Sequence, residues 1–321
     1  MKPLSSYVSK FMLWATSANP PNQTLTVFNF HGILESPLAV PDCCFIEFGA
    51  FKQYLAIIQK SYCVVSLDSG INMLLSGSLN KPLAMITFDD GFASLVRLVL
   101  PLLKETSIPV GCFINTDMID SDDTFWFCRV NQIISETRCK SVDWNAHHCD
   151  LRTISDREQA SHAIQESLKH MPAGRLRAEL STLATLLGVD ISAPVDKTSP
   201  FRVLSRAQIA EASDSGLVEF GGHTHSHAIL SQLTHSQQEV QILSNIEEIR
   251  NLTGCQPNTF AYPNGRPDDY DENSIRILQE AGVKAAFTTD SGRCEKSADV
   301  YRLPRVFVGP NATASDLISL V

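Results

Sequence analysis

The sequence predicts an α/β fold in which parallel strands alternate with helices around a barrel-like sheet. Short apolar runs rich in β-branched and aromatic residues alternate with helix-like segments along most of the chain, which is typical of parallel β/α units. Several of these runs end directly in polar residues, as strands do on the active-site face of an α/β barrel. We expect one domain over residues 1–321, with a helical insertion at 117–200.

The first half of the chain supplies the opening strands. The run TVFNF at 26–30 predicts a first strand that stops at His31-Gly32. A helix is expected at 48–59, where apolar residues recur at helical spacing. Further segments follow in order: strands at 62–67 and 84–88, a helix-like stretch at 92–104 that Pro101 interrupts, and a strand at 110–115.

Residues 117–200 have a different character. They are richer in polar residues and show helical patterns at 155–169 and 174–187, with no strand run of comparable strength. Because a structureless connection of this length is uncommon inside a domain, we expect a helical insertion between two barrel strands. Trp126, near its start, is expected either to anchor the insertion or to form a pocket wall.

The alternation resumes after the insertion. Ser205-x-x-Gln208 and Thr234-x-x-Gln237 have the capping-box pattern that opens a helix. A glycine follows each of these helices at its expected end. The remaining expected segments are strands at 217–222, 258–262, 285–289 and 300–308, and a helix at 274–281.

Composition and charge exclude several classes of function. Of 321 residues, 44% are hydrophobic and 19% are charged, as in a soluble globular protein with a sizeable core. The formal net charge of -9 provides no basic face, so nucleic acid is not an expected partner. No run of about 18 apolar residues occurs, so no transmembrane segment is expected.

The N-terminus and the cysteines bear on cellular location. The apolar stretch at 11–15 is shorter than the roughly 7–15 residues of a signal-peptide core, so we expect a cytoplasmic protein. The nine cysteines are scattered without a metal-site spacing and are expected to be reduced thiols rather than disulfides.

Polar residues gather where four of the predicted strands end. They are His31, the pair Asp89-Asp90, the segment from His223 to His227, and the segment from Tyr262 to Gly265. Since the carboxyl ends of barrel strands meet on one face, these groups are expected to converge there.

The acidic pair and the histidines suggest metal chemistry. Two adjacent carboxylates allow one to bind a cation while the other acts as a base, although Asp also suits a helix N-cap after a strand. His223 and His227 are four residues apart, so on a helix or tight turn they can share a metal. Such pairs also occur on surfaces without a role, and His225 lies between them.

Two imidazoles and one carboxylate make a plausible divalent metal site. Zinc is the expected ion, with cobalt, manganese and nickel as alternatives. Open coordination positions would hold water and a substrate oxygen, which is the minimum arrangement for hydrolysing an amide or an ester.

These motifs resemble those of a known family. Residues 87–91 (TFDDG) resemble the signature of polysaccharide deacetylases, also called the NodB-homology domain or carbohydrate esterase family 4. Residues 223–227 (HTHSH) match the family's H-[ST]-x-x-H motif, and residues 260–265 (FAYPNG) look like its third motif. The motifs occur in the family's order, and the similarity spans roughly residues 80–310.

The resemblance implies a fold and a set of roles. It implies a distorted (β/α) barrel of seven strands. It implies that Asp89 is the general base acting on water at the metal. The implied metal ligands are Asp90, His223 and His227. The backbone N–H of Asn264 would hold the oxyanion.

The third motif is also expected to contact substrate. Pro263 would shape its loop and lie at the substrate site. Tyr262 would either line the sugar site or pack in the core.

The chain departs from the family pattern in two places. The arginine that often orients the base is absent before the third motif, and Arg305 is our candidate substitute, with a surface arginine as the alternative. The late Leu-x-x-His motif that supplies the general acid is also absent, because no histidine follows His235. His31 is a candidate acid; a structural histidine, with the leaving amine protonated from solvent, is the alternative.

The expected activity is removal of an N-acetyl group from an N-acetylated sugar or glycoconjugate. A cytoplasmic location would favour an intermediate of surface-polysaccharide biosynthesis over a finished wall polymer. The alternatives are an O-acetyl, formyl or non-sugar amide hydrolase on the same scaffold, or a catalytically weak carbohydrate-binding protein. The sequence leaves the oligomeric state open.

Overall fold

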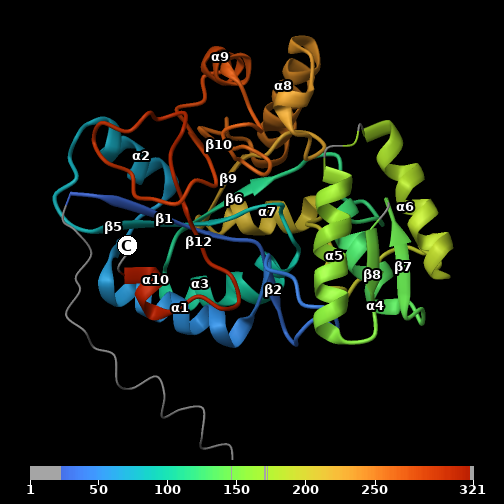
Figure 1. Cartoon of the computed structure of the whole chain (residues 1–321). Coiled ribbons are helices and arrows are strands. Elements are labelled where there is room, and N and C mark those ends of the chain that lie inside the picture. The colour runs from blue at the N-terminus through green and yellow to red at the C-terminus, as the bar shows by residue number, and fades with distance from the viewer. Residues whose placement is uncertain (1–22, 146, 170, 172, 319–321) are drawn as a thin grey trace, which may run out of the picture.

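The computed structural model describes residues 23–145, 147–169, 171 and 173–318. Its centre is a parallel sheet of eight strands, in which seven follow the order β11-β10-β9-β6-β5-β1-β12 and β4 pairs with β5 (Figure 1). The strands are β1 (Leu25–Phe30), β4 (Cys63–Val64), β5 (Leu83–Phe88), β6 (Val110–Ile114), β9 (Val218–Gly222), β10 (Thr259–Ala261), β11 (Ala285–Phe287) and β12 (Val306–Phe307). This arrangement confirms the predicted α/β fold with parallel strands.

The segment before β12 joins the two edges of the curved sheet. Leu303 exchanges backbone hydrogen bonds with β11, since its N–H donates to Ala286 and its carbonyl accepts from Thr288. A few residues later, β12 pairs with β1, with Val306 opposite Phe28. The segment therefore bridges the two ends of the strand order, as expected for a distorted barrel.

Helices pack on both sides of the sheet (Figure 1). They are α1 (Phe48–Ser61), α2 (Leu67–Leu75), the π-helical turn η1 (Leu95–Val99), α3 (Leu100–Thr106), α7 (Arg206–Asp214), the short η2 (Leu230–Gln232), α8 (His235–Thr253), α9 (Glu272–Glu280) and α10 (Ala314–Ile318). The two expected capping boxes form, at Ser205 with Gln208 and at Thr234 with Gln237. Both helices therefore begin where the sequence indicated.

Two segments differ from expectation. The expected strand at 62–67 is cut to Cys63–Val64, because Ser66 caps a new helix, α2, by accepting a hydrogen bond from the Ser69 N–H. Pro101 does not interrupt a helix interior; it lies in the first turn of α3, directly after the π-helical turn. Proline is tolerated there because the first turn needs no N–H donor.

Residues 117–200 hold three helices and a hairpin. They are α4 (Trp126–Glu136), β7 (Ser141–Trp144) paired antiparallel with β8 (His147–Asp150), α5 (Ile154–Lys169) and α6 (Ala173–Leu187). The hairpin was not expected from the sequence. These elements share a hydrophobic cluster that includes Val130, Ile164 and Leu183, and they lie together at one end of the sheet (Figure 1). That they form an insertion within a single domain stays our interpretation.

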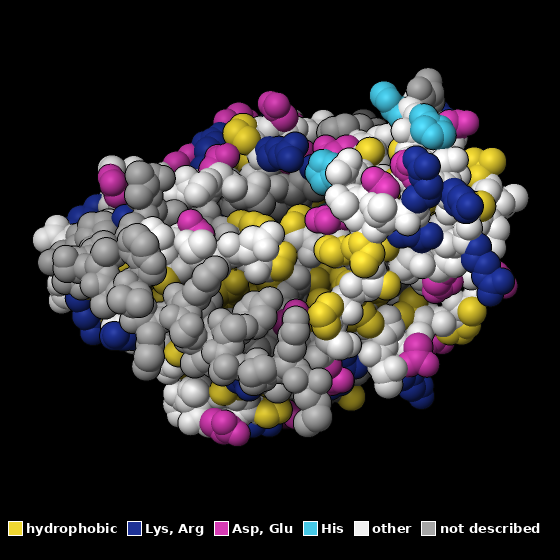
Figure 2. Space-filling model, turned by 60° about the horizontal axis from the view of Figure 1, so that its bottom comes forward, with side chains coloured by type: hydrophobic (Ala, Val, Ile, Leu, Met, Phe, Trp, Pro, Cys, Tyr) yellow, Lys and Arg dark blue, Asp and Glu magenta, His cyan; other side chains and the backbone are white. Residues whose placement is uncertain are grey.

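Four further sequence expectations concern the N-terminus, membrane-spanning segments, the cysteines and the surface charge. The N-terminal stretch on which the cytoplasmic expectation rests, residues 11–15, lies outside the described residues. Within the described part of the chain, no helix is long and apolar enough to cross a membrane. All nine cysteines are free thiols. The face shown in Figure 2 carries acidic and basic side chains together rather than one continuous basic patch.

Candidate active site

A cavity of about 430 Å³ opens at the carboxyl ends of the strands. Asp89 and Asp90 follow β5, His223 follows β9, and Arg305 precedes β12. Of the residues singled out from the sequence, all but Pro263 line this cavity: His31, Asp89, Asp90, His223, His227, Tyr262, Asn264 and Arg305. Their convergence follows from the parallel arrangement of the strands.

Asp90, His223 and His227 form a compact group of potential metal ligands. The Asp90 Oδ1 atom lies 3.4 Å from His223 Nε2 and 3.3 Å from His227 Nε2. One donor atom from each residue lies within 4.8 Å of the other two. Asp90 Oδ1 is buried and makes no hydrogen bond within the described chain. An oxygen and two nitrogens around an unsatisfied carboxylate fit a divalent ion such as zinc.

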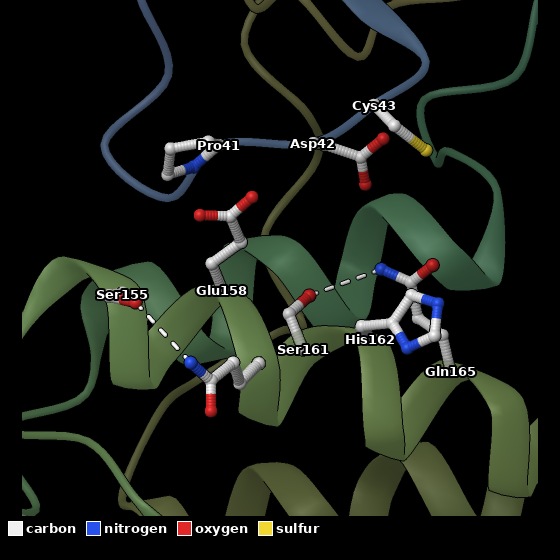
Figure 3. A pocket seen from close by; sticks show the side chains of 9 residues that line it. Pro41, Asp42, Cys43, Ser155, Glu158, Ser161, His162 and Gln165 are labelled. Atoms are coloured by element: carbon white, nitrogen blue, oxygen red, sulfur yellow. Dashed lines mark hydrogen bonds between the residues drawn. The ribbon is translucent and has the colours of Figure 1, made fainter.

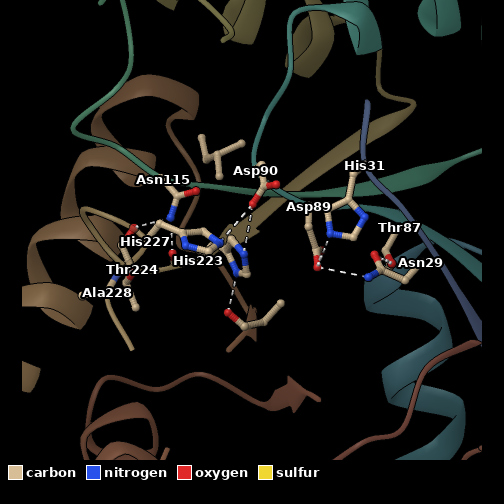
Figure 4. Close-up of polar contacts among 12 residues, drawn as sticks. Asn29, His31, Thr87, Asp89, Asp90, Asn115, His223, Thr224, His227 and Ala228 are labelled. Carbon is tan, nitrogen blue, oxygen red and sulfur yellow. Dashed lines mark hydrogen bonds and ion pairs between the residues drawn. The ribbon is translucent and has the colours of Figure 1, made fainter. Parts of the chain in front are cut away.

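The surroundings fix the His223 side chain. Its Nδ1 lies 2.7 Å from the Ala261 carbonyl oxygen, so the N–H on that side donates there and Nε2 faces Asp90 (Figure 4). The backbone is also held, because the His223 N–H donates to Asn245 Oδ1 at 3.1 Å and Asn115 Nδ2 donates to the His223 carbonyl. These contacts pre-organise one imidazole as a ligand.

The turn between the two histidines separates His225 from the site. Thr224 and His227 have positive φ, 62° and 56°, and the Ala228 N–H donates to Thr224 Oγ1 at 3.1 Å. His225 Nδ1 instead lies 2.9 Å from Thr116 Oγ1. The tight turn therefore brings His223 and His227 together and directs His225 to a different partner.

Backbone strain is concentrated at the site. Eight described non-glycine residues have positive φ, and Asp90, Thr224, His227 and Asn264 are four of them. Conformations of this kind cost about 1–3 kcal/mol each and persist where the surrounding structure enforces them. Their clustering around one cavity is typical of a functional site.

Asp89 is held by a buried arginine. Arg305 donates from both terminal nitrogens, to Asp89 Oδ1 at 2.8 Å and to Oδ2 at 2.7 Å, while its Nε donates to the Thr288 carbonyl at 2.9 Å. Asn29 Nδ2 adds a hydrogen bond of 3.2 Å to Asp89 Oδ2. Arg305 is only 1% exposed, so it is not a surface arginine.

The charged groups determine the ionisation of the carboxyls. Burial opposes ionisation of Asp89, but the positive charge of Arg305 outweighs it and holds the pKa of Asp89 below its ordinary value. Burial likewise opposes ionisation of Asp90, and its contacts with His223 and His227 hold its pKa below the ordinary value. Both side chains are therefore carboxylates at neutral pH.

His31 lies beside Asp89. Its Nε2 is 3.9 Å from Asp89 Oδ2, and its side chain is 15% exposed. Its Nδ1 is buried without a hydrogen-bond partner among the described residues. One edge of the ring therefore faces the acidic pair (Figure 4).

Asn264, in the loop after β10, lines the cavity. Asn264 has φ of 59° and Gly265 has φ of 66°. The loop is fixed by hydrogen bonds from the Gly265 N–H to the Pro263 carbonyl at 2.7 Å and from Thr289 Oγ1 to the Asn264 carbonyl at 2.6 Å. Within the described chain, the Asn264 N–H donates to no protein acceptor. It is thus available to a ligand.

Tyr262 packs mainly in the core. Its side chain is 0% exposed, and its ring stacks on Tyr270 with 4.0 Å between centroids. Its hydroxyl donates to the Tyr301 carbonyl at 3.1 Å. The geometry favours core packing over the alternative of a sugar-stacking surface.

A model of the polysaccharide deacetylase family matches residues 76–286, which is more than half of the chain. The protein belongs to this family. A putative polysaccharide deacetylase of Bacillus subtilis, YxkH, is 28% identical over 112 residues, or 35% of this chain and 39% of that protein. The poly-β-1,6-N-acetyl-D-glucosamine N-deacetylase of Staphylococcus epidermidis is 30% identical over 118 residues, or 34% of this chain and 40% of that protein. The chain thus matches about two fifths of the length of these relatives.

Solved deacetylase structures share the fold over nearly the whole chain. The Streptococcus pyogenes deacetylase PplD, in complex with acetate, aligns with a TM-score of 0.60 and 16% identity, covering 92% of this chain and 97% of that one. IcaB from Ammonifex degensii aligns with a TM-score of 0.58 and 19% identity, covering 93% and 96%. At these identities the likeness establishes the fold.

Trp126, at the start of α4, lines the cavity, which was one of its two expected roles. Other residues of the site were missed from the sequence. The neighbouring Phe127 also lines the cavity, and its ring lies 5.5 Å from that of His227. Residues of α5 and of the loop at 42–44 also contribute to the wall. Asn29 lines the cavity as well. Its polar side chain within a buried strand was the available signal of a polar site, because a buried amide needs a hydrogen-bond partner.

Proposed function

We propose that the protein removes acetyl groups from the amino sugars of a polysaccharide or glycoconjugate, with a divalent metal bound by Asp90, His223 and His227. The observation that carries the proposal is an ionised carboxylate, Asp89, fixed beside three convergent metal-ligating groups. When bound, the metal would supply Lewis acidity to the water and to the acetyl carbonyl.

Asp89 is the proposed base. A carboxylate has about four acceptor positions, and Arg305 and Asn29 occupy three of them, one on Oδ1 and two on Oδ2. The remaining position on Oδ1 is directed to accept the proton of the attacking water. The same contacts keep the carboxylate from rotating, so that it meets the water in one orientation.

Asn264 and His31 complete the proposed machinery. The Asn264 N–H, which has no protein acceptor among the described residues, would donate to the oxyanion that forms on the acetyl oxygen. His31, on the other side of Asp89, would give a proton to the departing amine. Without this proton the leaving group would be an amide anion, which is a very poor one.

The relatives support an amino-sugar polymer as substrate. The Staphylococcus epidermidis relative is named as an N-deacetylase of poly-β-1,6-N-acetyl-D-glucosamine. The open cavity of about 430 Å³ has room for a sugar unit, with aromatic side chains of α4 in its wall. We therefore propose an N-acetylated hexosamine unit as the group bound beside the metal ligands.

The proposal is tested by assaying N-acetylated and O-acetylated oligosaccharides side by side with metal-reconstituted protein. The expected result is acetate release from the N-acetylated sugar with one new primary amine for each acetate. Acetate from the O-acetylated sugar alone would support the esterase alternative instead. Sugar binding without any acetate release would favour a carbohydrate-binding protein.

A further inference from the structure

A second cavity, of about 470 Å³, adjoins the catalytic cavity. It lies between the loop at 41–43 and α5 (Figure 3). The two cavities share wall residues, namely Asp42, Cys43, His162 and Gln165. Ligands bound at this loop would therefore be next to the substrate site.

The loop presents three potential metal ligands. One donor atom each from Asp42, Cys43 and Cys44 lies within 4.8 Å of the other two. Asp42 Oδ1 accepts a hydrogen bond of 2.9 Å from the Cys44 N–H, which folds the loop around this group. A backbone hydrogen bond holds the end of the loop, because the Gly32 N–H donates to the Cys44 carbonyl. Gly32 begins β2 (Gly32–Leu34), and Cys44 directly precedes β3 (Phe45–Glu47).

The charges around the loop favour a cation. Neither Asp42 nor Glu158 forms an ion pair with any described residue. The Glu158 side chain extends from α5 toward the loop, so that both carboxylates border one space (Figure 3). Cys43 is exposed and Cys44 is half-buried.

We propose that Asp42, Cys43 and Cys44 form a second metal site, for a thiophilic divalent cation such as zinc. Two thiolates and a carboxylate are a ligand set that zinc and cadmium accept in tetrahedral geometry. Water would take the fourth position. Since the three residues also line the catalytic cavity, an ion here would narrow the cavity, and the two thiol protons that it displaces would leave to solvent.

Cadmium distinguishes this site from the catalytic one. Cadmium bound by thiolates absorbs in the ultraviolet through sulfur-to-cadmium charge transfer. The ligands proposed for the catalytic metal are nitrogen and oxygen atoms, so cadmium bound there would not give this absorption. We expect one Cd²⁺ ion per chain to give this absorption in reduced wild-type protein. The Cys43→Ser/Cys44→Ser variant should lose it, and Cys255→Ser, which removes another exposed thiol, should keep it.

Two further variants separate the proposal from general effects. Asp42→Asn keeps both sulfurs, so it should retain the absorption while weakening Cd²⁺ affinity roughly tenfold, or about 1.4 kcal/mol. His223→Ala should retain the absorption fully, whether or not the protein is a deacetylase. An unchanged absorption in the double serine variant, or none in wild-type protein, would overturn the second site. Circular dichroism of each variant checks that the fold is intact.

Discussion

At the scale of single residues, Asp89 and Arg305 form the most constrained pair in the site. Two hydrogen bonds of 2.8 and 2.7 Å join them, and a third, to the Thr288 carbonyl, fixes the guanidinium. Removing one partner of a buried ion pair leaves the other charge uncompensated, at a cost of about 3–5 kcal/mol. The pair thus couples the orientation of the proposed base to the stability of the barrel.

Arg305→Lys tests this coupling. Lysine keeps the charge but cannot make the paired hydrogen bonds, so Asp89 should lose its fixed orientation. We expect kcat to fall by about 10- to 100-fold with little change in KM. The matched control is Arg302→Lys, at an exposed arginine that pairs with Asp299 and Glu272, and it should leave kcat unchanged. Equal kinetics for the two variants would contradict an orienting role for Arg305.

His31→Gln tests the proposed acid. We expect kcat on the N-acetylated sugar to fall roughly 100-fold or more, because the amine must be protonated as it leaves. An aryl acetate ester should be much less affected, since its leaving group needs no proton. Similar losses on both substrates would indicate that His31 acts by supporting the structure of the site.

At the scale of elements, the loop after β10 sets the position of the Asn264 N–H. A Cβ atom added at Gly265 would lie 3.0 Å from both the Thr289 nitrogen and the Tyr262 carbonyl oxygen. Neither backbone atom can move without shifting the loop or β11. The loop therefore has little freedom to accept a larger residue.

Gly265→Ala is expected to displace this loop. Gly282 is the matched control, because its φ is also positive, at 79°, but a Cβ atom there meets nothing within 4 Å. Both alanine variants should lose about 1 kcal/mol of stability from the left-handed backbone. Only Gly265→Ala should lose activity, by about tenfold or more. Thermal denaturation and acetate release measure the two effects, and equal activity in both variants would argue against an oxyanion role for Asn264.

The elements also show why only part of the site could be predicted from the sequence. Asp89-Asp90 and His223 were predicted correctly to converge, because they directly follow strands whose parallel order is readable from apolar runs. The helix α2, which begins at the last residue of the strand expected at 62–67, was missed, since Ser66 as an N-cap is a weak signal within a β-rich run. The hairpin β7–β8 was also missed, because each of its strands has only four residues.

At the scale of the whole molecule, the site is shaped by contacts that join distant parts of the chain. The wall formed by α4, α5 and the loop at 42–44 depends on how residues 117–200 pack against the barrel. Local patterns carry no information about that packing, so Cys43 was not recognised as a cavity residue, and a pocket wall was only one of two roles expected for Trp126. Arg305 was named as the candidate arginine through the family resemblance, because no local pattern reports a contact with Asp89 that spans 216 positions in the sequence.

The central claim is that adjacent aspartates divide the work, with Asp90 binding the metal and Asp89 acting as the base. The most direct test measures metal content and acetate release together in the Asp89→Asn and Asp90→Asn proteins. Both proteins also carry Cys43→Ser/Cys44→Ser, so that the loop thiols do not bind metal. The account predicts that the Asp89→Asn protein retains a single metal ion and releases no acetate, while the Asp90→Asn protein loses the metal. Acetate release by the Asp89→Asn protein at the unmodified rate, or undiminished metal affinity in the Asp90→Asn protein, would contradict it.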